Sequence, residues 1–305
     1  MALKDRIPLG MSLPHRGYAP VPMATVTQVA RRAEALGFRE LWVTENTLDH
    51  VASFDPMVAL TYAAAVTQKI RLGLAVAVLP VHEPRRTAHQ VASLDYMSGG
   101  RAIFGAGIGR EAHLEAFQVP REGRVRRFRE AIELMRALWT EDKVDYRGSV
   151  YRLEGGTMPL KPLQRPLPIW LGGGHPQAIA RAAELAQGWM AAGGSNTADF
   201  GRAVALLRTA LERAGRDPAG FPISKRVFVA VDARPERARA ALERWYTEVY
   251  RNPPGTDASG IHGTPEQVRQ RLDDLVGMGA NHLLLNPVGD FAAQLEALAE
   301  VAGLG

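Results

Sequence analysis

Residues 169–194, with the sequence IWLGGGHPQAIARAAELAQGWMAAGG, read as a strand, three glycines, a helix and a second strand that again ends in glycines. Both strands are continuously apolar, which is typical of strands buried on both faces of a parallel sheet. Glycine weakens regular structure, so a glycine cluster at a strand end marks a special backbone conformation or the close approach of another group. The stretch therefore predicts a unit of a parallel sheet with room for a ligand at the strand ends.

The order of helix, glycine and apolar strand recurs along the chain, for example in residues 30–45 and 271–287. Eight such strands are predicted, and they begin near Ile7, Glu40, Arg71, Arg101, Pro168, Gly188, Lys225 and His282. Eight βα units in about 250 residues, plus insertions, are typical of a (β/α)8 TIM barrel. A doubly wound sheet is the alternative, but GAGIGR at 105–110 has an arginine in place of the third glycine of its dinucleotide-binding motif. We therefore expect an α/β protein with a (β/α)8 barrel.

Two gaps between the predicted strands are too long for one helix. Residues 141–167 contain two β-rich runs around Gly148, which predict a hairpin insertion. Residues 250–265 are rich in glycine and proline and show no periodicity, so we expect a loop that acts as a lid over the barrel mouth. Neither segment reads as a separate domain, and we expect residues 1–305 to form a single one.

Composition narrows the class of protein. The chain has 305 residues, no cysteine and a net charge of +5, so it has no disulfide framework and no thiol nucleophile. Its longest apolar run, residues 72–81, is too short to span a membrane, and no secretory signal opens the chain, so we expect a cytoplasmic protein. The arginines of residues 124–139 lie beside acidic residues, with i,i+4 pairs along a solvated helix face, which argues against nucleic acid as a partner. An anionic small molecule stays possible as a ligand.

Several catalytic motifs are missing from the sequence. It contains no H-x-x-x-H pair for zinc, no G-x-S-x-G elbow for a serine nucleophile and no G-K-[ST] phosphate loop. We therefore expect no metal site and no serine hydrolase chemistry.

The candidate site lies where the predicted strands end, because the carboxyl ends of barrel strands form the active face. Two glycine-rich strand ends supply Gly172, Gly173, Gly174, Gly193, Gly194 and Ser195. A helix with Pro176 in its first turn follows the first cluster, and the free N–H groups and dipole of a helix start attract an anion. Either cluster alone would indicate a simple turn, but two adjacent clusters favour a phosphate site.

Polar residues end two other predicted strands, namely His15 in the first and Glu45 with Asn46 in the second. Taken singly, each of them is more often a hydrogen-bonded structural residue than a catalytic one. His15 is the better acid–base candidate, because imidazole titrates near neutrality.

Three stretches resemble one family. Residues 93–109, SLDYMSGGRAIFGAGIG, are similar to the L-D-x-L-S-G-G-R segment and glycine-rich fourth strand of the luciferase-like monooxygenase superfamily, whose members are flavin- and deazaflavin-dependent barrels. Residues 34–45 resemble its passage from first helix to second strand, and residues 129–174 resemble its hairpin insertion and fifth strand. The resemblance extends to about Gly194, and beyond that point only the barrel pattern continues.

This resemblance implies a flavin or deazaflavin whose phosphate rests on the glycines already named. It implies ring contacts from three strand ends, which here carry Asn46, Ala75, Val76, Gly107 and Gly109. Relatives have a non-proline cis peptide in the third strand, which aligns with Ala75–Val76. Relatives often have an Asp-His pair where this chain has Glu45-Asn46, and some have a lysine where it has Ser195 and Asn196. Glu45 is then expected to orient the ring or a neighbouring group, and a homodimer is expected by analogy.

Three functional hypotheses follow from the resemblance. The first is an oxidoreductase that uses coenzyme F-420 to move a hydride to or from a small organic substrate. The second is a monooxygenase that uses reduced FMN and oxygen. The third is a non-catalytic protein that binds the coenzyme. The basic charge favours F-420, because its polyglutamate tail is anionic.

Overall fold

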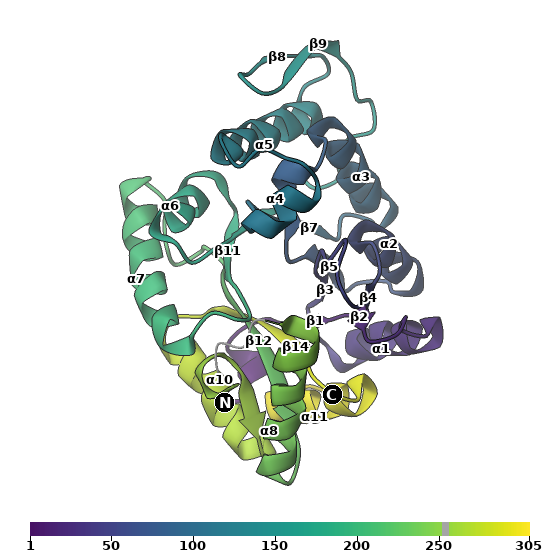
Figure 1. Cartoon of the computed structure of the whole chain (residues 1–305), viewed down its shortest axis with the longest axis vertical. Helices are drawn as coiled ribbons and strands as arrows, with labels where there is room; N and C mark the ends of the chain where they lie inside the picture. Colours follow the sequence, from purple (N-terminus) through teal and green to yellow (C-terminus); the bar gives the residue numbers. More distant parts are fainter. Residues whose placement is uncertain (252–255) are drawn as a thin grey trace.

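The apolar strands predicted from the sequence form one closed parallel sheet in the computed structural model, which describes residues 1–251 and 256–305 (Figure 1). Neighbouring strands pair in parallel all the way round, and β10 pairs with β7 to close the ring. The barrel strands are β1 (Leu9–Ser12), β3 (Glu40–Val43), β5 (Arg71–Leu74), β7 (Ala102–Gly107), β10 (Ile169–Gly172), β11 (Gly188–Ala191), β12 (Ile223–Val231) and β14 (His282–Pro287). The (β/α)8 barrel is confirmed, and the largest offsets of a predicted strand start are Ile7 against Leu9 and Lys225 against Ile223.

Helices alternate with these strands and surround the barrel (Figure 1). They are α1 (Met23–Leu36), α2 (Pro56–Val66), α3 (Pro84–Met97), α4 (Glu111–Ala116), α5 (Arg124–Thr140), α6 (Pro176–Leu185), α7 (Thr197–Arg213), α8 (Pro235–Arg244), α10 (Pro265–Gly277) and α11 (Phe291–Ala302). The apolar face of each long helix packs on the outside of the sheet, as the spacing of Val26, Val29, Ala33 and Leu36 in α1 predicts. None of the helices in the described residues is both long and apolar enough to cross a membrane.

Tryptophan side chains fill the inside of the barrel. The rings of Trp42 and Trp170 lie 5.2 Å apart between centroids, and both are buried. Gly73 and Gly188 stand on strands beside them, where a Cβ would collide with the ring of Trp42 or of Trp170. These strand glycines are therefore required by packing, and both tryptophans belong to the core.

A polar group lies below this tryptophan layer, at the starts of the strands. His282 places Nδ1 2.8 Å from the Ser224 hydroxyl and Nε2 3.1 Å from Glu40 Oε2, and all three residues are buried. The edge of the His282 ring also contacts Trp170. This hydrogen-bonded group of Ser224, His282 and Glu40 is buried inside the barrel, at the end away from the mouth. It therefore stabilises the core and takes no part in the site.

Several short elements lie outside the eight barrel strands and the main helices. The pair β8 (Val144–Arg147) and β9 (Arg152–Gly156) is an antiparallel hairpin within residues 141–167, and it projects beside α5 (Figure 1). The remaining short elements are η1 (Leu3–Asp5), β2 (Arg16–Gly17), β4 (Ala52–Ser53), β6 (Ala77–Val78), η2 (Leu79–Val81), the π-helix η3 (Trp245–Tyr250), α9 (Thr256–Ser259) and β13 (Ile261–Gly263).

The predicted loop at 250–265 differs from the structure. Residues 252–255 lie outside the described part of the chain, but α9 and β13 occupy much of the remainder. Strand β13 pairs in parallel with β12 through Ile261 and Gly263. Its three residues become a strand because they pair with the end of β12. Such tertiary pairing cannot be predicted from the local sequence pattern. The lid role stays a prediction.

Candidate functional site

Two loops after β10 and β11 leave a row of backbone N–H groups uncommitted. Within residues 1–251 and 256–305, the N–H groups of Gly173, Gly174 and His175 have no hydrogen-bond partner, and neither do those of Gly193 and Gly194. The first three precede α6, whose N-terminal dipole adds a partial positive charge. Five donors on two paired strands form a site that suits an anion.

The first loop also has the geometry that only glycine gives. Gly173 has a φ of +132°, and a Cβ there would lie 2.9 Å from the Ala178 side chain. Around Gly174 a Cβ would meet nothing within 4 Å, so the space over this residue is open. The indole N–H of Trp189 donates to the Gly173 carbonyl at 2.8 Å and holds the loop in place. A ligand can therefore approach the backbone closely at Gly174.

Ser195 is predicted to contact the cofactor, and in the structure it closes a turn. Its N–H donates to the Ala192 carbonyl and so is not available to a ligand, because residues 192–195 form a tight turn. Lys225 on β12, which was predicted only as a strand start, reaches this turn from below. Its Nζ donates to the carbonyl of Ala192 at 2.7 Å and to the carbonyl and hydroxyl of Ser195 at 3.2 and 3.0 Å.

The Lys225 side chain is fully buried, and burial lowers its pKa to about 7. Its hydrogen bonds fix the second glycine loop from beneath. The local signal was a lysine at the start of an otherwise apolar strand, which is unusual enough to call for a buried partner.

The Val76 side chain forms an apolar floor between the strand ends. The peptide Ala75–Val76 is cis, as the resemblance implied. The Val76 side chain occupies the space in front of two glycines: a Cβ on Gly107 would lie 2.8 Å from it, and one on Gly172 would lie 3.2 Å from it. Gly109 has a φ of +71° and packs on Val78. The missing side chains at Gly107 and Gly172 therefore make room for Val76, and a ring could lie only above it.

Glu45 pairs with a residue that the sequence did not single out as a site residue. Its carboxylate accepts the Val78 N–H at 2.6 Å and contacts His82 Nε2 at 2.8 Å. Glu45 is 4 % exposed and His82 37 %. Burial lowers the pKa of His82, but the hydrogen bond and charge of Glu45 outweigh it, so the pKa is raised. The mouth thus holds a carboxylate-supported imidazole that is open on one side.

His15 is enclosed by contrast. Its Nδ1 donates to the Leu13 carbonyl at 2.6 Å, and its Nε2 accepts from the Thr44 N–H at 3.0 Å and lies 2.8 Å from the Thr44 hydroxyl. The Asn46 amide donates to that hydroxyl at 2.5 Å. Burial lowers the pKa of His15 to about 4. Both ring nitrogens are occupied, so the geometry favours an orienting role, and proton transfer by His15 stays a prediction.

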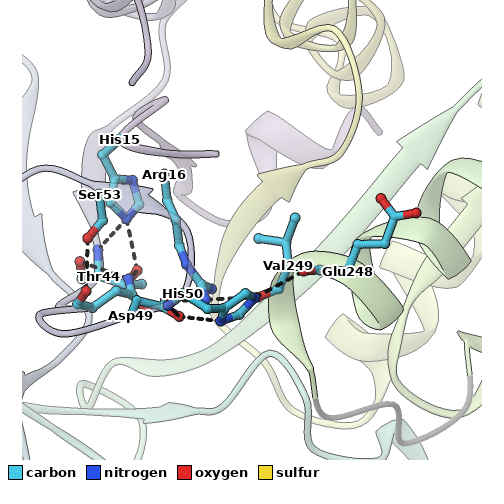
Figure 2. A network of polar contacts seen from close by, with 9 residues as sticks. His15, Arg16, Thr44, Asp49, His50, Ser53, Glu248 and Val249 are labelled. Carbon is cyan, nitrogen blue, oxygen red and sulfur yellow. Dashed lines mark hydrogen bonds and ion pairs between the residues drawn. The ribbon is translucent and has the colours of Figure 1, made fainter. Parts of the chain in front are cut away.

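A charged network joins the loops after β1 and β3 to the π-helix η3 (Figure 2). Arg16 forms an ion pair with Asp49 and donates to the Val249 carbonyl at 2.9 Å. His50 contacts Asp49 at 2.7 Å and the Glu248 carbonyl at 3.0 Å. Cations beside the last carbonyls of a helix stabilise its C-terminal end. This network therefore fixes the end of η3, and with it Tyr250, at the barrel mouth.

No group of three or more His, Asp or Glu side chains within the described chain is arranged to hold a metal ion. The chemistry of the mouth therefore comes from the N–H row, the apolar floor and the paired charges.

Comparisons with known proteins agree with this geometry. Residues 7–282 match the family model for luciferase-like monooxygenases. An uncharacterised protein of Mycobacterium tuberculosis is 31 % identical over 81 % of this chain and 94 % of its own length. The F-420-dependent glucose-6-phosphate dehydrogenase of Kineococcus radiotolerans is 28 % identical over 78 % of this chain and 72 % of its own. The crystal structure of a monooxygenase from Streptomyces bottropensis superposes with a TM-score of 0.85 at 24 % identity, covering 96 % of this chain and 98 % of that one, which supports the fold. The chain belongs to the luciferase-like monooxygenase family of oxidoreductases.

Proposed function

We propose that the protein uses coenzyme F-420 to transfer a hydride to or from a small organic substrate. The observation that carries the proposal is the row of five free N–H groups at Gly173, Gly174, His175, Gly193 and Gly194, beside the apolar floor of Val76. A phosphate on the N–H row and a ring above the floor fit these residues. When bound, the deazaflavin supplies a ring carbon that accepts or donates the hydride.

The proposed roles of the polar residues follow from their contacts. The N–H row holds the phosphate, Lys225 fixes the second glycine loop from beneath, and Val76 supports the ring. His82 is the proposed proton-transfer group, because its Nδ1 has no partner within the described residues and Glu45 raises its pKa. The hydrogen bonds among His15, Thr44 and Asn46 join the loops after β1 and β3. Glu45 in the second loop is thereby held beside Val78.

Excess positive charge beside the phosphate loops favours F-420 over FMN. Burial lowers the pKa of Arg181 on α6, and the like charges of Arg129 and Arg124 lower it further. FMN ends at its phosphate, whereas F-420 continues into several carboxylates. Arg181 on the helix that follows the proposed phosphate site suits the longer coenzyme, and the F-420-dependent relative supports the same choice.

Fluorescence titration of the purified protein with each coenzyme tests the proposal. We expect F-420 to bind at micromolar concentration or tighter and to weaken as salt rises, with FMN bound less well. Arg181→Ala should weaken F-420 about 2- to 5-fold and leave FMN unchanged, because exposed ion pairs contribute up to about 1 kcal/mol each. Arg31→Ala on α1 is the matched control.

Two results would redirect the assignment. Tighter FMN binding together with oxygen consumption on supply of reduced FMN would identify a monooxygenase. Tight F-420 binding without any hydride exchange across a panel of alcohols and organic acids, followed by coenzyme absorbance, would identify a binding protein. The homodimer and the cytoplasmic location stay predictions, which sedimentation and cell fractionation would test.

A further inference from the structure

Arg226 is a cation inside the barrel mouth. It lies on β12 between Ser224 and Phe228, whose side chains also point into the barrel. Its Nε donates to Asn286 Oδ1 at 2.8 Å, and its guanidinium carbon lies 4.9 Å from the centroid of the Phe228 ring. These two contacts hold the guanidinium plane in a fixed place and use only one of its five N–H groups.

No carboxylate neutralises Arg226 within residues 1–251 and 256–305. Two acids of the mouth are already engaged, Asp49 with Arg16 and His50, and Glu45 with His82. The four N–H groups on Nη1 and Nη2 have no partner in this part of the chain either. Arg226 is partly exposed, and a partly desolvated cation without a counter-charge can be stabilised by an anionic ligand.

Arg16 adds to the imbalance. Its side chain is only 10 % exposed and shares Asp49 with His50, while its own Nε is buried without a partner in the described residues. His15, which feels both guanidinium groups, is kept neutral by burial first and by these two charges in addition. The floor of the mouth on this side therefore carries more positive than negative charge.

We propose that Arg226 binds a carboxylate of the organic substrate, so that the substrate is a small organic acid. The proposal rests on the hydride-transfer function proposed above and specifies its substrate class. The planar guanidinium fork matches a carboxylate through two parallel hydrogen bonds. The rings of Phe228 and Tyr250, 4.9 Å apart between centroids, supply an apolar wall for the carbon skeleton.

The coenzyme phosphate is the competing anion for Arg226. Gly193, whose N–H belongs to the phosphate row, lies against the Arg226 stem, since a Cβ there would be 3.5 Å from its Cγ. The phosphate site, however, already has five N–H donors. Arg226 instead bonds Asn286 on β14, which is on the other side of β12 from the glycine loops. We therefore assign it to the substrate.

Calorimetric titration with benzoate, and with benzamide as its neutral counterpart, tests the assignment in the full-length protein with and without bound coenzyme. We expect benzoate to bind at least 10-fold more tightly than benzamide, and Arg226→Met to remove that preference. Arg226→Lys should keep part of it, because the charge remains and the fork is lost. Arg202→Met, at a side chain that is 76 % exposed on α7, is the control and should change nothing.

Three results would overturn the proposal. These are equal affinity for benzoate and benzamide, an unchanged preference in Arg226→Met, and a loss of coenzyme affinity in Arg226→Met as large as the loss of benzoate affinity. Binding of inorganic phosphate in place of benzoate would refute the carboxylate assignment. If Arg226→Met fails to fold, Arg226→Lys with the same ligand pair decides. The titration without coenzyme needs no turnover, so its failure is distinct from a failure of the F-420 proposal.

Discussion

The two halves of the barrel rim are built for recognition in opposite ways. The half at β10 and β11 offers bare backbone, where the N–H groups of Gly173, Gly174, Gly193 and Gly194 have no partner in the described part of the chain. The half at β1 and β3 offers charged side chains that pair with one another, Arg16 with Asp49 (Figure 2) and Glu45 with His82. A backbone site is rigid and independent of pH, which suits a cofactor phosphate that never changes. A site made of side chains changes its charge with pH, which suits proton transfer. Single substitutions can also change what it binds, which suits substrate recognition.

The largest expected effect is on turnover in the charged half. His82→Asn should lower kcat by roughly 10²–10⁴-fold, because it removes the imidazole that Glu45 supports. Steady-state rates over pH give the measurement, with coenzyme affinity as the control for site integrity. Glu45→Gln should lower the pKa of His82 towards its ordinary value and shift the pH profile the same way. If His15→Ala, and not His82→Asn, produces the large loss, the predicted role of His15 is right and ours for His82 is wrong.

The second effect concerns the neutral His15. The unfolded chain protonates this group near pH 6.5, but the folded chain does so only near pH 4, because the site is buried. The unfolded state therefore binds more protons between these values, and the free energy of unfolding should fall by about 3 kcal/mol as pH drops from 6.5 to 4. His15→Gln should remove this step in urea unfolding at a series of pH values, whereas His89→Gln, at an exposed histidine, should keep it. A wild-type protein without the step would show that His15 is solvated.

The third effect breaks the backbone half. Gly174→Asp should weaken coenzyme binding about 100-fold by setting a negative charge against the phosphate, while the fold survives because a Cβ there meets nothing. Gly174→Asn is the matched control without the charge. Gly173→Asp should be at least as damaging, but it also strains the backbone at φ +132° and crowds Ala178. Unchanged affinity in a folded Gly174→Asp protein, measured by fluorescence titration, would refute the phosphate assignment.

The sequence was informative for the backbone half and much less so for the charged half, and the reason is physical. Strand periodicity and glycine clusters are local, so the barrel and the loops at Gly172–Gly174 and 193–195 could be predicted from neighbours in the chain. The partners of the other half are distant: Glu45 and His82 are 37 positions apart, and Arg16 and Val249 are 233 apart. Such pairs exist only after the barrel closes. The roles of Arg226 and Lys225 could not be predicted for the same reason, because the sequence pattern of their strand indicated only burial.

The smallest expected effect is on coenzyme binding at the boundary between the two halves, where Lys225 supports the second glycine loop. Lys225→Met should weaken coenzyme binding about 10-fold, because three hydrogen bonds to Ala192 and Ser195 are lost, each contributing on the order of 1 kcal/mol before relaxation. Ser195→Ala, which removes only the hydroxyl acceptor, is the graded comparison. A Lys225→Met protein with full affinity would mean that the turn at 192–195 holds without its cation.

The π-helix η3 gives this rim a means of diversification. A π turn takes in one residue more than an α turn, and such turns are found mainly as single-residue insertions in ordinary helices. Here the wide turn at Trp245–Tyr250 ends by setting the Tyr250 ring against Phe228 and Gly194. Deleting one residue would return the helix to α geometry and swing Tyr250 round by about 100°. A single codon gained or lost here would therefore move one wall of the proposed substrate site, while η3 lies outside the barrel strands and leaves their register unchanged.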